Sequence, residues 1–416
     1  MAADNFARIL VICTRQIGDV LLTTPLIDAA KRRWPDARLD VLGFAGTLGV
    51  LRGNPQIDRL IEVPAGSGWL RSLALIGRLW RRYDLALIAQ GSDRAHLYGA
   101  VAARRRSGLV ESKRSNAWWK KALLDHAVAV DEDPTHAVLE KLRLLEPWAA
   151  PQHEVRVQAP PGHPLPPALA ARLRERYVVL QVPTIVHYKQ WPLVHQSVLV
   201  RGLLDDGLQV VLTGGPSEGD RAKTAQVARA VEEDGGASGT ADDARVLDVA
   251  GLLDLNQMAT LLHGAALYIG PDTSITHLAA ACGTPVIAIY GPIDPRLFGP
   301  WPQAHPASQP YVERARRQPR ATILLLQGDP PCVPCNAQGC ERHNDSRSEC
   351  LETLLPQRVL DEARAKLGLP HAAERAGGPV GAAALASAAP VASVASAAPE
   401  TPAASALHFD IDGAAR

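Results

Sequence analysis

The segment GPDTSITHLAAACGTPVIAIYGP, residues 270–292, decides how the fold of this chain is read. It continues the apolar run ALYIG, which predicts a buried strand that ends in a turn. The stretch SITHLAAACG (274–283) then predicts a helix, and PVIAIYG (285–291) predicts a second strand. Strand, helix and strand in this order predict a right-handed parallel crossover, so the fold class is α/β.

The same alternation occurs in both halves of the chain. In the first half, the pattern predicts strands at 8–13 and 37–44 with a helix at 20–34 between them. In the second half, the alternation starts again at YVVLQV (177–182). The sequence therefore predicts two parallel α/β domains.

Changes in composition suggest the domain boundaries. The middle of the chain is rich in proline, which predicts an interdomain linker at 151–170. We therefore expect residues 1–150 to form the first domain and residues 171–370 the second. Residues 371–416 are rich in Ala, Ser, Pro and Gly and poor in large apolar side chains. We expect this C-terminal tail to be disordered.

Composition and charge exclude several classes of protein. A chain of 416 residues with 47% hydrophobic content can bury a large core, and its 44 basic and 43 acidic residues nearly cancel. Residues 71–121 are locally basic, with 12 Lys or Arg against 3 Asp or Glu, which indicates either a solvated surface or a site for an anionic partner. Because we find neither a run of 18 apolar residues nor a signal-like N-terminus, we expect a soluble cytoplasmic protein, with no nucleic-acid partner.

The turn at the start of the quoted helix carries an acid, three hydroxyls and a histidine. The N–H groups of a helix start lack partners, and the positive end of the helix dipole attracts an anion such as phosphate. The turn also lies at the strand edge where parallel sheets bind ligands. The alternative is that an acid or hydroxyl here only caps the helix. We favour a phosphate site formed by Asp272, Thr273, Ser274, Thr276 and His277.

The corresponding turn of the first half is TRQIGDVLLTTP, residues 14–25. Gly18 permits either a close approach of another segment or a positive φ. Asp19 lies at the predicted helix start. It is interpreted either as an N-cap or as a base that faces a phosphorylated donor held by the other domain.

Two loops of the second half extend the predicted donor site. In VPTIVHYKQWP (182–192), Lys189 is suited to neutralise a diphosphate, although a lone lysine is also common on any protein surface. In LTGGPSEGD (212–220), Gly214 and Gly215 suit close approach by a nucleotide. This turn lacks the P-loop lysine and contains no GxGxxG, so neither a P-loop NTPase nor a standard dinucleotide site is supported.

These motifs together resemble glycosyltransferase family nine, the ADP-heptose:lipopolysaccharide heptosyltransferases. The resemblance covers about residues 8–367 and rests on ILVICTRQIGDVLLTTPLIDAAKRRWPDARLDVL (9–42), KQWP (189–192) and YIGPDTSITHLAAACGTPVIAIYGPIDP (268–295). The family implies a GT-B fold, with two Rossmann-like domains facing across a cleft. It also implies inverting, metal-independent transfer of heptose from ADP-heptose to the inner core of lipopolysaccharide, onto the lipid A-linked acidic sugar or the first heptose.

The resemblance also implies roles for individual residues. Asp19 matches the general base, Lys189 matches the lysine that contacts the donor phosphates, and the turn at 272–274 matches the one that holds the diphosphate and sugar. Ser274 stands where the family commonly has glycine, so a side chain lies where phosphate or heptose approaches the backbone. The predicted donor set is Thr184, Lys189, Gly214, Gly215, Asp272, Thr273, Ser274, Thr276 and His277, and the predicted acceptor set is Gly18, Arg104, Arg105 and Arg106.

The implied acceptor is anionic and anchored to lipid. The basic stretch 71–121, which contains Trp118 and Trp119, suits such an acceptor and a peripheral position on the inner face of the cytoplasmic membrane. Two alternatives stay open. One keeps the fold and the donor but takes a protein hydroxyl as acceptor, and the other is a noncatalytic protein that binds a nucleotide sugar, in which Asp19 is only a cap.

Four cysteines crowd the segment 332–350 of the second domain, with two, four and nine residues between them. In a cytosolic protein, a CxxC pair with two further thiols nearby indicates a structural zinc or iron site rather than disulfides, although this spacing is not that of a standard ribbon. We expect no cofactor for catalysis. A structural metal at Cys332, Cys335, Cys340 and Cys350 is weighed against reduced or redox-paired thiols.

Overall fold

The computed structural model describes residues 5–63, 69–111, 117–130, 133–233 and 245–370. The segment 371–416, for which disorder is predicted, lies outside these ranges, as do Lys113 and Arg114 of the basic stretch. Within the described ranges, no helix is both long enough and apolar enough to cross a membrane.

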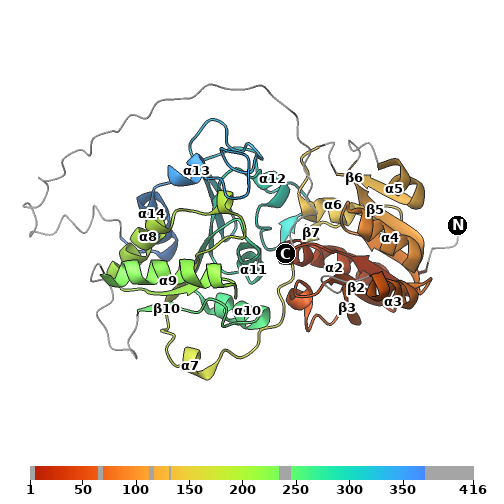
Figure 1. Cartoon of the computed structure of the whole chain (residues 1–416), viewed down its shortest axis with the longest axis horizontal. Coiled ribbons are helices and arrows are strands. Elements are labelled where there is room, and N and C mark those ends of the chain that lie inside the picture. The colour runs from red at the N-terminus through yellow and green to blue at the C-terminus, as the bar shows by residue number, and fades with distance from the viewer. Residues whose placement is uncertain (1–4, 64–68, 112–116, 131–132, 234–244, 371–416) are drawn as a thin grey trace, which may run out of the picture. The chain divides into compact units, whose positions relative to one another are not determined.

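Six parallel strands form the sheet of the first half (Figure 1). Their order is β3-β2-β1-β4-β5-β6, so the chain builds outward on one side of β1 and then crosses to the other side. The strands are β1 (Arg8–Ile12), β2 (Arg38–Phe44), β3 (Arg59–Val63), β4 (Tyr83–Ile88), β5 (Ala103–Val110) and β6 (His126–Ala129).

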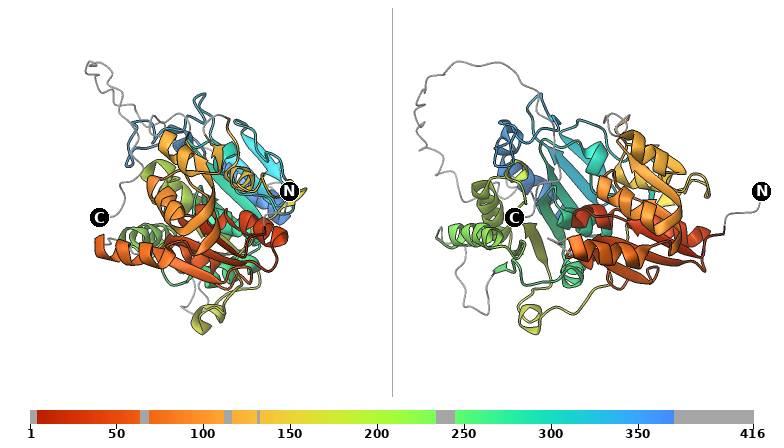
Figure 2. Two further views of the ribbon diagram at one scale, coloured as in Figure 1. Left: turned by 90° about the vertical axis from the view of Figure 1, so that its right-hand side faces the viewer. Right: turned by 45° about the vertical axis from the view of Figure 1, so that its right-hand side comes forward.

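Helices cover both faces of this sheet (Figure 2). Alternate residues of β1 point to opposite faces: Ile9 and Val11 pack in the core with the second helix, whereas Leu10 and Ile12 pack with the third and fourth. Because both faces are buried, the strand reads as a continuous apolar run. The helices are α1 (Ile17–Leu21), α2 (Thr24–Arg33), α3 (Trp69–Leu79), α4 (Asp93–Ala102), α5 (Ala117–Leu123) and α6 (Ala137–Arg143), with a 3-10 turn η1 (Leu48–Leu51).

The single helix predicted at 20–34 is two helices in the structure. α1 ends at Leu21, and α2 starts afresh with Thr23 as its N-cap and Pro25 in its first turn. Proline lacks the N–H that would continue an existing helix but fits the first turn of a new one. The break leaves α1 as a separate short helix, and its own first turn carries Asp19.

The sheet of the second half repeats this order. Its strands run β10-β9-β8-β11-β12-β15-β14, all parallel except β14, which is antiparallel to β15. The strands are β8 (Tyr177–Gln181), β9 (Gln209–Thr213), β10 (Val246–Asp248), β11 (Leu267–Pro271), β12 (Val286–Tyr290), β14 (Arg317–Arg320) and β15 (Ile323–Gln327). The helices are α8 (Leu193–Asp205), α9 (Glu218–Glu233), α10 (Leu255–Gly264), α11 (Ser274–Ala281), α12 (Pro295–Phe298), α13 (Glu349–Glu352) and α14 (Pro356–Leu367), with a 3-10 turn η2 (His187–Lys189).

Residues 151–170, for which a linker is predicted, contain two short elements. These are β7 (Glu154–Val155) and α7 (Pro167–Ala170). β7 pairs antiparallel with β13 (His305–Pro306), and the buried indole of Trp301 donates to the carbonyl of Val155 at 3.0 Å. The segment between the two sheets is therefore fastened to the second half of the chain.

The order of strands reverses at one point in each sheet, between β1 and β4 and between β8 and β11. Loops that leave the carboxyl ends of these strands diverge to opposite faces, which opens the crevice where open α/β sheets bind ligands. Asp19 follows β1, while Lys189 follows β8 and Asp272 follows β11. Three of the predicted site residues therefore lie at these two switch points.

The substitution Gly328→Ala is expected to destabilise the second half. A Cβ atom on Gly328, directly after β15, would overlap the main-chain carbonyl of Cys350, and backbone cannot rotate away as a side chain can. We expect the free energy of unfolding to fall by about 1–3 kcal/mol in a denaturant titration. Gly219→Ala in α9 is the matched control, because no atom lies within 4 Å of its added Cβ. An equal loss in both variants would contradict the close contact.

Candidate active site

The first turn of α1 lies directly against the first turn of α11. A Cβ atom on Gly18 would lie 3.3 Å from Cδ2 of His277 and 3.6 Å from Cα of Ser274. The φ angle of Gly18 is not positive, so glycine is needed here for close approach and not for backbone freedom. This contact joins the carboxyl edges of the two sheets. It brings Asp19 close enough for its charge to act on both His277 and Lys189.

An ion pair spans the switch point of the second sheet. Nζ of Lys189 lies 2.6 Å from Oδ2 of Asp272, and the hydroxyl of Tyr290 donates to Oδ1 of the same carboxylate at 3.3 Å. Burial by itself lowers the pKa of Lys189, but the charge and hydrogen bond of Asp272 more than reverse this, so the pKa lies above its usual value. The sheet edge therefore holds a fixed cation at neutral pH.

No side chain caps the start of α11. Its N-cap is Thr273, whose side chain makes no capping hydrogen bond, and Asp272 is engaged with Lys189. The capping interpretation is therefore wrong for this turn. Within the described part of the chain, the hydroxyl of Ser274 makes no hydrogen bond, so the positive end of this helix retains donors near the lysine.

His277 is buried between acidic groups from both halves. Its side chain is 6% exposed, and its Nε2 lies 3.9 Å from Oδ1 of Asp272. Burial lowers the pKa of His277 below its usual value, against the opposing charges of Asp272 and Asp19. The ring is therefore neutral at pH 7, and its Nδ1 has no hydrogen-bond partner among the described residues.

Asp19 combines a fixed backbone with an accessible carboxylate. The N-cap of α1 is Gln16, so the capping interpretation is wrong for Asp19 too. The Asp19 carbonyl accepts hydrogen bonds from Oγ1 of Thr23 at 2.8 Å and from Nζ of Lys141 at 3.1 Å. Its carboxylate is 18% exposed and lies 3.5 Å from Nε of Arg15. The carboxylate is thus presented to a ligand from a rigid turn.

Lys141 is a site residue that the sequence patterns did not reveal. It lies on α6, its side chain is 3% exposed, and its charge acts on His277. It lies three residues after the buried Val138 of α6 and four residues before the buried Leu145, which follows the helix. A lysine on an apolar helical face was the available signal, because such a group is rarely buried without a partner.

Several predicted donor residues instead hold the loops in shape. The hydroxyl of Thr276 is fully buried and donates to the carbonyl of Pro271, and that of Thr184 donates to the carbonyl of Val186 at 2.7 Å. These side chains position the two turns, so direct donor contact by either hydroxyl is not supported. Gly214 and Gly215 lie in the turn after β9, where a Cβ atom would press against Pro183 or Asp220.

The predicted acceptor residues Arg104–106 lie far from Asp19. They occupy the start of β5, and Arg105 pairs with Leu85 of β4, which in turn pairs with Ile9 at the start of β1. At about 3.3 Å per residue, they are roughly 15 Å from the carboxyl edge. Arg105 also forms an ion pair with Asp125 at 2.9 Å. The structure brings only Gly18 of the predicted acceptor set to the site.

The four clustered cysteines differ in exposure. Cys332, Cys335 and Cys340 are exposed, whereas Cys350 is buried. Burial and the three neighbouring thiols raise the pKa of Cys350 to about 12. Among the described residues, which include all four cysteines, no three His, Cys, Asp or Glu side chains are arranged to hold a metal ion. The structural zinc or iron site at these cysteines stays a prediction.

The cysteine-rich segment instead fastens the turn that carries Lys189. The amide of His187 donates to the carbonyl of Asn344 at 2.9 Å, and Oγ of Ser348 donates to the carbonyl of Tyr188 at 2.7 Å. Both hydrogen bonds join the 3-10 turn η2 to the cysteine-rich segment. The position of the lysine thus depends on residues more than 150 positions away in the sequence.

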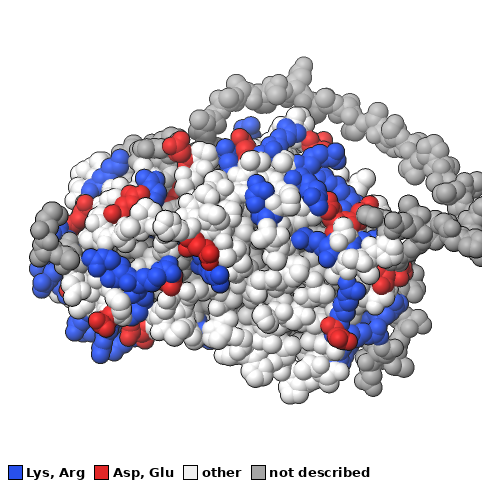
Figure 3. All heavy atoms as spheres, turned by 180° about the vertical axis from the view of Figure 1, so that it is seen from behind, with Lys and Arg blue, Asp and Glu red and all other residues white. Residues whose placement is uncertain are grey.

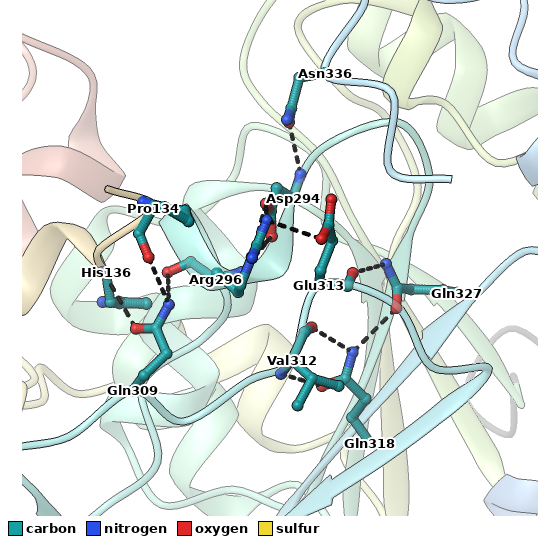
Figure 4. Close-up of polar contacts among 10 residues, drawn as sticks. All are labelled: Pro134, His136, Asp294, Arg296, Gln309, Val312, Glu313, Gln318, Gln327 and Asn336. Atoms are coloured by element: carbon teal, nitrogen blue, oxygen red, sulfur yellow. Dashed lines mark hydrogen bonds and ion pairs between the residues drawn. The ribbon is translucent and has the colours of Figure 1, made fainter. Parts of the chain in front are cut away.

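A second polar network ties α6 to the loops of the second sheet (Figure 4). The side-chain carbonyl of Gln309 accepts from the amide of His136, and its NH₂ group donates to the carbonyls of Pro134 at 3.3 Å and Arg296 at 2.9 Å. Arg296 is paired with the buried Asp294 at 2.7 Å. This network fixes the start of the helix whose second turn reaches Asp19 through Lys141.

Comparison with known proteins decides the family. The model of glycosyltransferase family 9 (heptosyltransferase) matches residues 72–317. The chain belongs to glycosyltransferase family 9. Lipopolysaccharide heptosyltransferase 3 of Escherichia coli K12 is 28% identical over 299 residues, which cover 69% of this chain and 83% of that protein.

Solved structures support the same fold. The E. coli ADP-heptose lps heptosyltransferase II superposes with a TM-score of 0.63 at 22% identity and covers 86% of this chain and 98% of its own. The iron-containing dodecameric glycosyltransferase TibC from enterotoxigenic E. coli H10407 superposes with a TM-score of 0.50 at 15% identity, covering 88% of this chain and 77% of its own. This family 9 glycosyltransferase therefore has the GT-B fold that the resemblance implied.

The buried His136 is expected to make stability depend on pH. Its Nε2 donates to the carbonyl of Gly299 at 2.8 Å, and burial lowers its pKa to about 3. The unfolded chain binds this proton near pH 6.5 and the folded chain only near pH 3, so the free energy of unfolding falls as pH drops below about 6.5. His136→Gln keeps the donor and should reduce that slope by about 1 kcal/mol per pH unit.

The slope is measured by denaturant titrations between pH 6.5 and 5. His163→Gln is the matched control, because the His163 side chain is 52% exposed. The prediction fails if both variants keep the slope of the unaltered protein.

Proposed function

We propose that this family 9 glycosyltransferase transfers heptose from ADP-heptose to a hydroxyl of the lipopolysaccharide inner core, with inversion and without a catalytic metal. The observation that carries the proposal is the approach of Gly18 to Ser274 and His277, which brings a partly exposed carboxylate to a fixed cation and an uncapped helix start. Relatives named for lipopolysaccharide and for ADP-heptose support the choice of acceptor and donor.

The donor diphosphate is assigned to the edge of the second sheet. Lys189 carries the positive charge that neutralises a departing nucleoside diphosphate, and Asp272 holds the ammonium group in place at 2.6 Å. The main-chain N–H groups at the start of α11 add donors aimed at the same anion. Donors that are fixed before the reaction stabilise the charge that develops on the leaving group. These protein groups supply the role that a divalent cation has in metal-dependent transfer.

Asp19 is assigned as the general base. It accepts the proton of the acceptor hydroxyl. The oxygen of that hydroxyl attacks the anomeric carbon of the donor heptose, and the diphosphate leaves from the opposite face. This single displacement inverts the anomeric configuration. Lys141 and Thr23 hold the main chain of Asp19, so the carboxylate is presented in one orientation. His277 is neutral and buried beside Asp272, so its ring adds no charge to the site.

The test compares Asp19→Asn with the unaltered protein, using ADP-heptose and purified lipid A acceptors that carry the acidic core sugar, with and without one heptose. EDTA is present throughout. Loss of a general base typically lowers kcat by about 10²–10⁴-fold, and ADP binding should be unchanged. Asp28→Asn is the matched control, because it removes the same charge nine positions away on α2, where Asp28 pairs with Arg32 at 2.7 Å.

The outcomes separate the alternatives. Transfer that survives EDTA and is lost only in Asp19→Asn supports the proposal and identifies the acceptor. ADP binding without transfer to either lipid acceptor would reject it. In that case, labelled heptose appearing on a polypeptide would support a protein acceptor, and no product at all would support a protein that only binds nucleotide sugars.

We further propose that the helices α3, α4 and α5 rest on the anionic inner face of the cytoplasmic membrane. α4 contacts both neighbours, and the three helices expose Leu73, Leu97 and Trp118, whose exposed fractions are 53%, 56% and 73%. Arg94 and Lys121 are exposed on the same helices. Apolar side chains among basic ones are typical of surfaces that contact anionic lipid. On the face seen in Figure 3, opposite to that of Figure 1, basic and acidic residues are interspersed.

Binding to vesicles tests this surface. Leu97→Ser is expected to weaken co-sedimentation with vesicles of anionic phospholipid several-fold, because it removes apolar area from the bilayer contact. Leu252→Ser is the matched control, since Leu252 is 66% exposed but lies in the second half of the chain, before α10. Equal vesicle binding by both variants would exclude this face.

A further inference from the structure

Two arginines lie at the carboxyl edge of the first sheet, where the acceptor meets Asp19. Arg15 lies in the loop between β1 and α1, and Arg94 lies in the first turn of α4, which follows β4. β1 and β4 flank the switch point of this sheet, where α/β proteins bind ligands. The arginines at 104–106 lie at the opposite edge, so the cations that can meet an acceptor are these two.

Arg15 contacts Asp19 but keeps its hydrogen-bond donors free. Its Nε lies 3.5 Å from Oδ2 of Asp19, and its side chain is 39% exposed. With the residues that the structure describes, the guanidinium makes no hydrogen bond, and none of its nitrogens is shut off from solvent. A guanidinium carries five N–H donors in a planar fork that matches the oxygens of a carboxylate or phosphate. A ligand that reaches Asp19 can therefore also reach this fork.

The loop that carries Arg15 is held on both sides. Thr14 is 5% exposed, and its Oγ1 accepts from Nε2 of Gln90 at 2.6 Å. The same nitrogen donates to Oγ of Ser92, the N-cap of α4, at 2.6 Å. On the other side, Gln16 is the N-cap of α1. A main chain that is fixed in advance reduces the ordering cost when the arginine binds a ligand.

Positive charge is in excess where these two loops meet. Asp93 belongs to the loop after β4, but it pairs with the buried Lys120 at 2.6 Å. Arg94 forms no ion pair within the described ranges, and its guanidinium carbon lies 6.0 Å from the ring centre of Phe44 at the end of β2. Because β1 lies between β2 and β4, this side chain extends past the end of β1. Two arginines thus stand against one carboxylate that is not neutralised elsewhere, that of Asp19, and this excess favours an anion.

We infer that Arg15 is a specificity-determining residue that binds an anionic group of the acceptor, a sugar carboxylate or a phosphate ester. The identification of the ligand as the acceptor rests on the proposed function, in which Asp19 takes the proton of the acceptor hydroxyl. Because Arg15 contacts Asp19, the bound anion belongs to the sugar that reacts or to the sugar next to it. The charge of Arg15 also offsets the repulsion that an acidic acceptor would meet from Asp19.

The test combines variants of the protein with variants of the ligand. The probe is the core oligosaccharide released from lipopolysaccharide by complete removal of its acyl chains, with one heptose attached, titrated calorimetrically in the presence of ADP. It is used intact, with its carboxylates reduced to alcohols, and with its phosphates removed. Arg15→Gln should weaken binding of the intact oligosaccharide about tenfold or more and raise the acceptor KM equally. The ADP dissociation constant should stay within about twofold.

The modified oligosaccharides identify the source of the anion. The form that lacks the group bound by Arg15 should bind the unaltered protein about tenfold more weakly or worse. Arg15→Gln should weaken the binding of that form no further, because the partner of the arginine is already gone. If Arg15→Gln weakens the binding of both modified forms as much as that of the intact one, the subsite is overturned.

A matched control and a kinetic readout separate ligand binding from support of Asp19. Arg32→Gln is the control, because Arg32 on α2 also pairs with an aspartate four residues away, Asp28, at 2.7 Å. It should leave the affinity for oligosaccharide unchanged. If Arg15 only steadied Asp19, Arg15→Gln would lower kcat equally with all three acceptors and leave oligosaccharide binding unchanged. That result would contradict the inference.

The results distinguish this inference from the proposed function. Unchanged oligosaccharide binding in a folded Arg15→Gln variant would overturn the subsite, even if Asp19→Asn abolishes transfer. An equal loss of ADP affinity would overturn it too, because Arg15 would then belong to the donor side. Absence of binding by the unaltered protein would have the same consequence. Binding that depends on Arg15 and on one anionic group, without any transfer, would support the subsite and reject the assigned reaction.

Discussion

The candidate site depends on one close approach, that of α1 to α11 at Gly18. Asp19 belongs to the first sheet, whereas Lys189 and Asp272 belong to the second, so no local feature of the sequence places them together. A Cβ atom at position 18 would lie 3.3 Å from Cδ2 of His277, so the ring would have to give by a few tenths of an ångström. The Cβ of Ser274 would lie 3.8 Å from the added atom, which is ordinary van der Waals contact.

Burial and neighbouring charges determine which groups around this contact are charged. Lys189 remains charged because Asp272 offsets its desolvation. His277 stays neutral because the nearby carboxylates do not offset the desolvation of its ring. Lys141 is buried with the carbonyl of Asp19 as its acceptor. The site therefore combines the Lys189–Asp272 ion pair, the accessible carboxylate of Asp19 and the neutral ring of His277. This combination suits an anionic leaving group opposite a hydroxyl that must lose its proton.

The sequence predicted what is encoded locally and missed what depends on distant contacts. The turn at residues 271–277 was recognisable because its strand, turn and helix are adjacent in the chain. β5 was not, because RRR at 104–106 reads as a charge run, although residues 105–108 pair with β4. The same error made these arginines acceptor residues, whereas the parallel register sets them at the opposite edge. Lys141 and the bonds from 344 and 348 to η2 join segments that no short motif connects.

Different kinds of side chain bridge the two switch points. The second is bridged by Lys189 and Asp272, a charged pair suited to an anion that must be held and then released. The first is bridged by Gln90 and Thr14, a neutral pair with one polar atom unmatched. A neutral pair at the second point would leave the departing charge unstabilised. The bridge at the second switch point therefore carries charged groups, whereas the bridge at the first carries none.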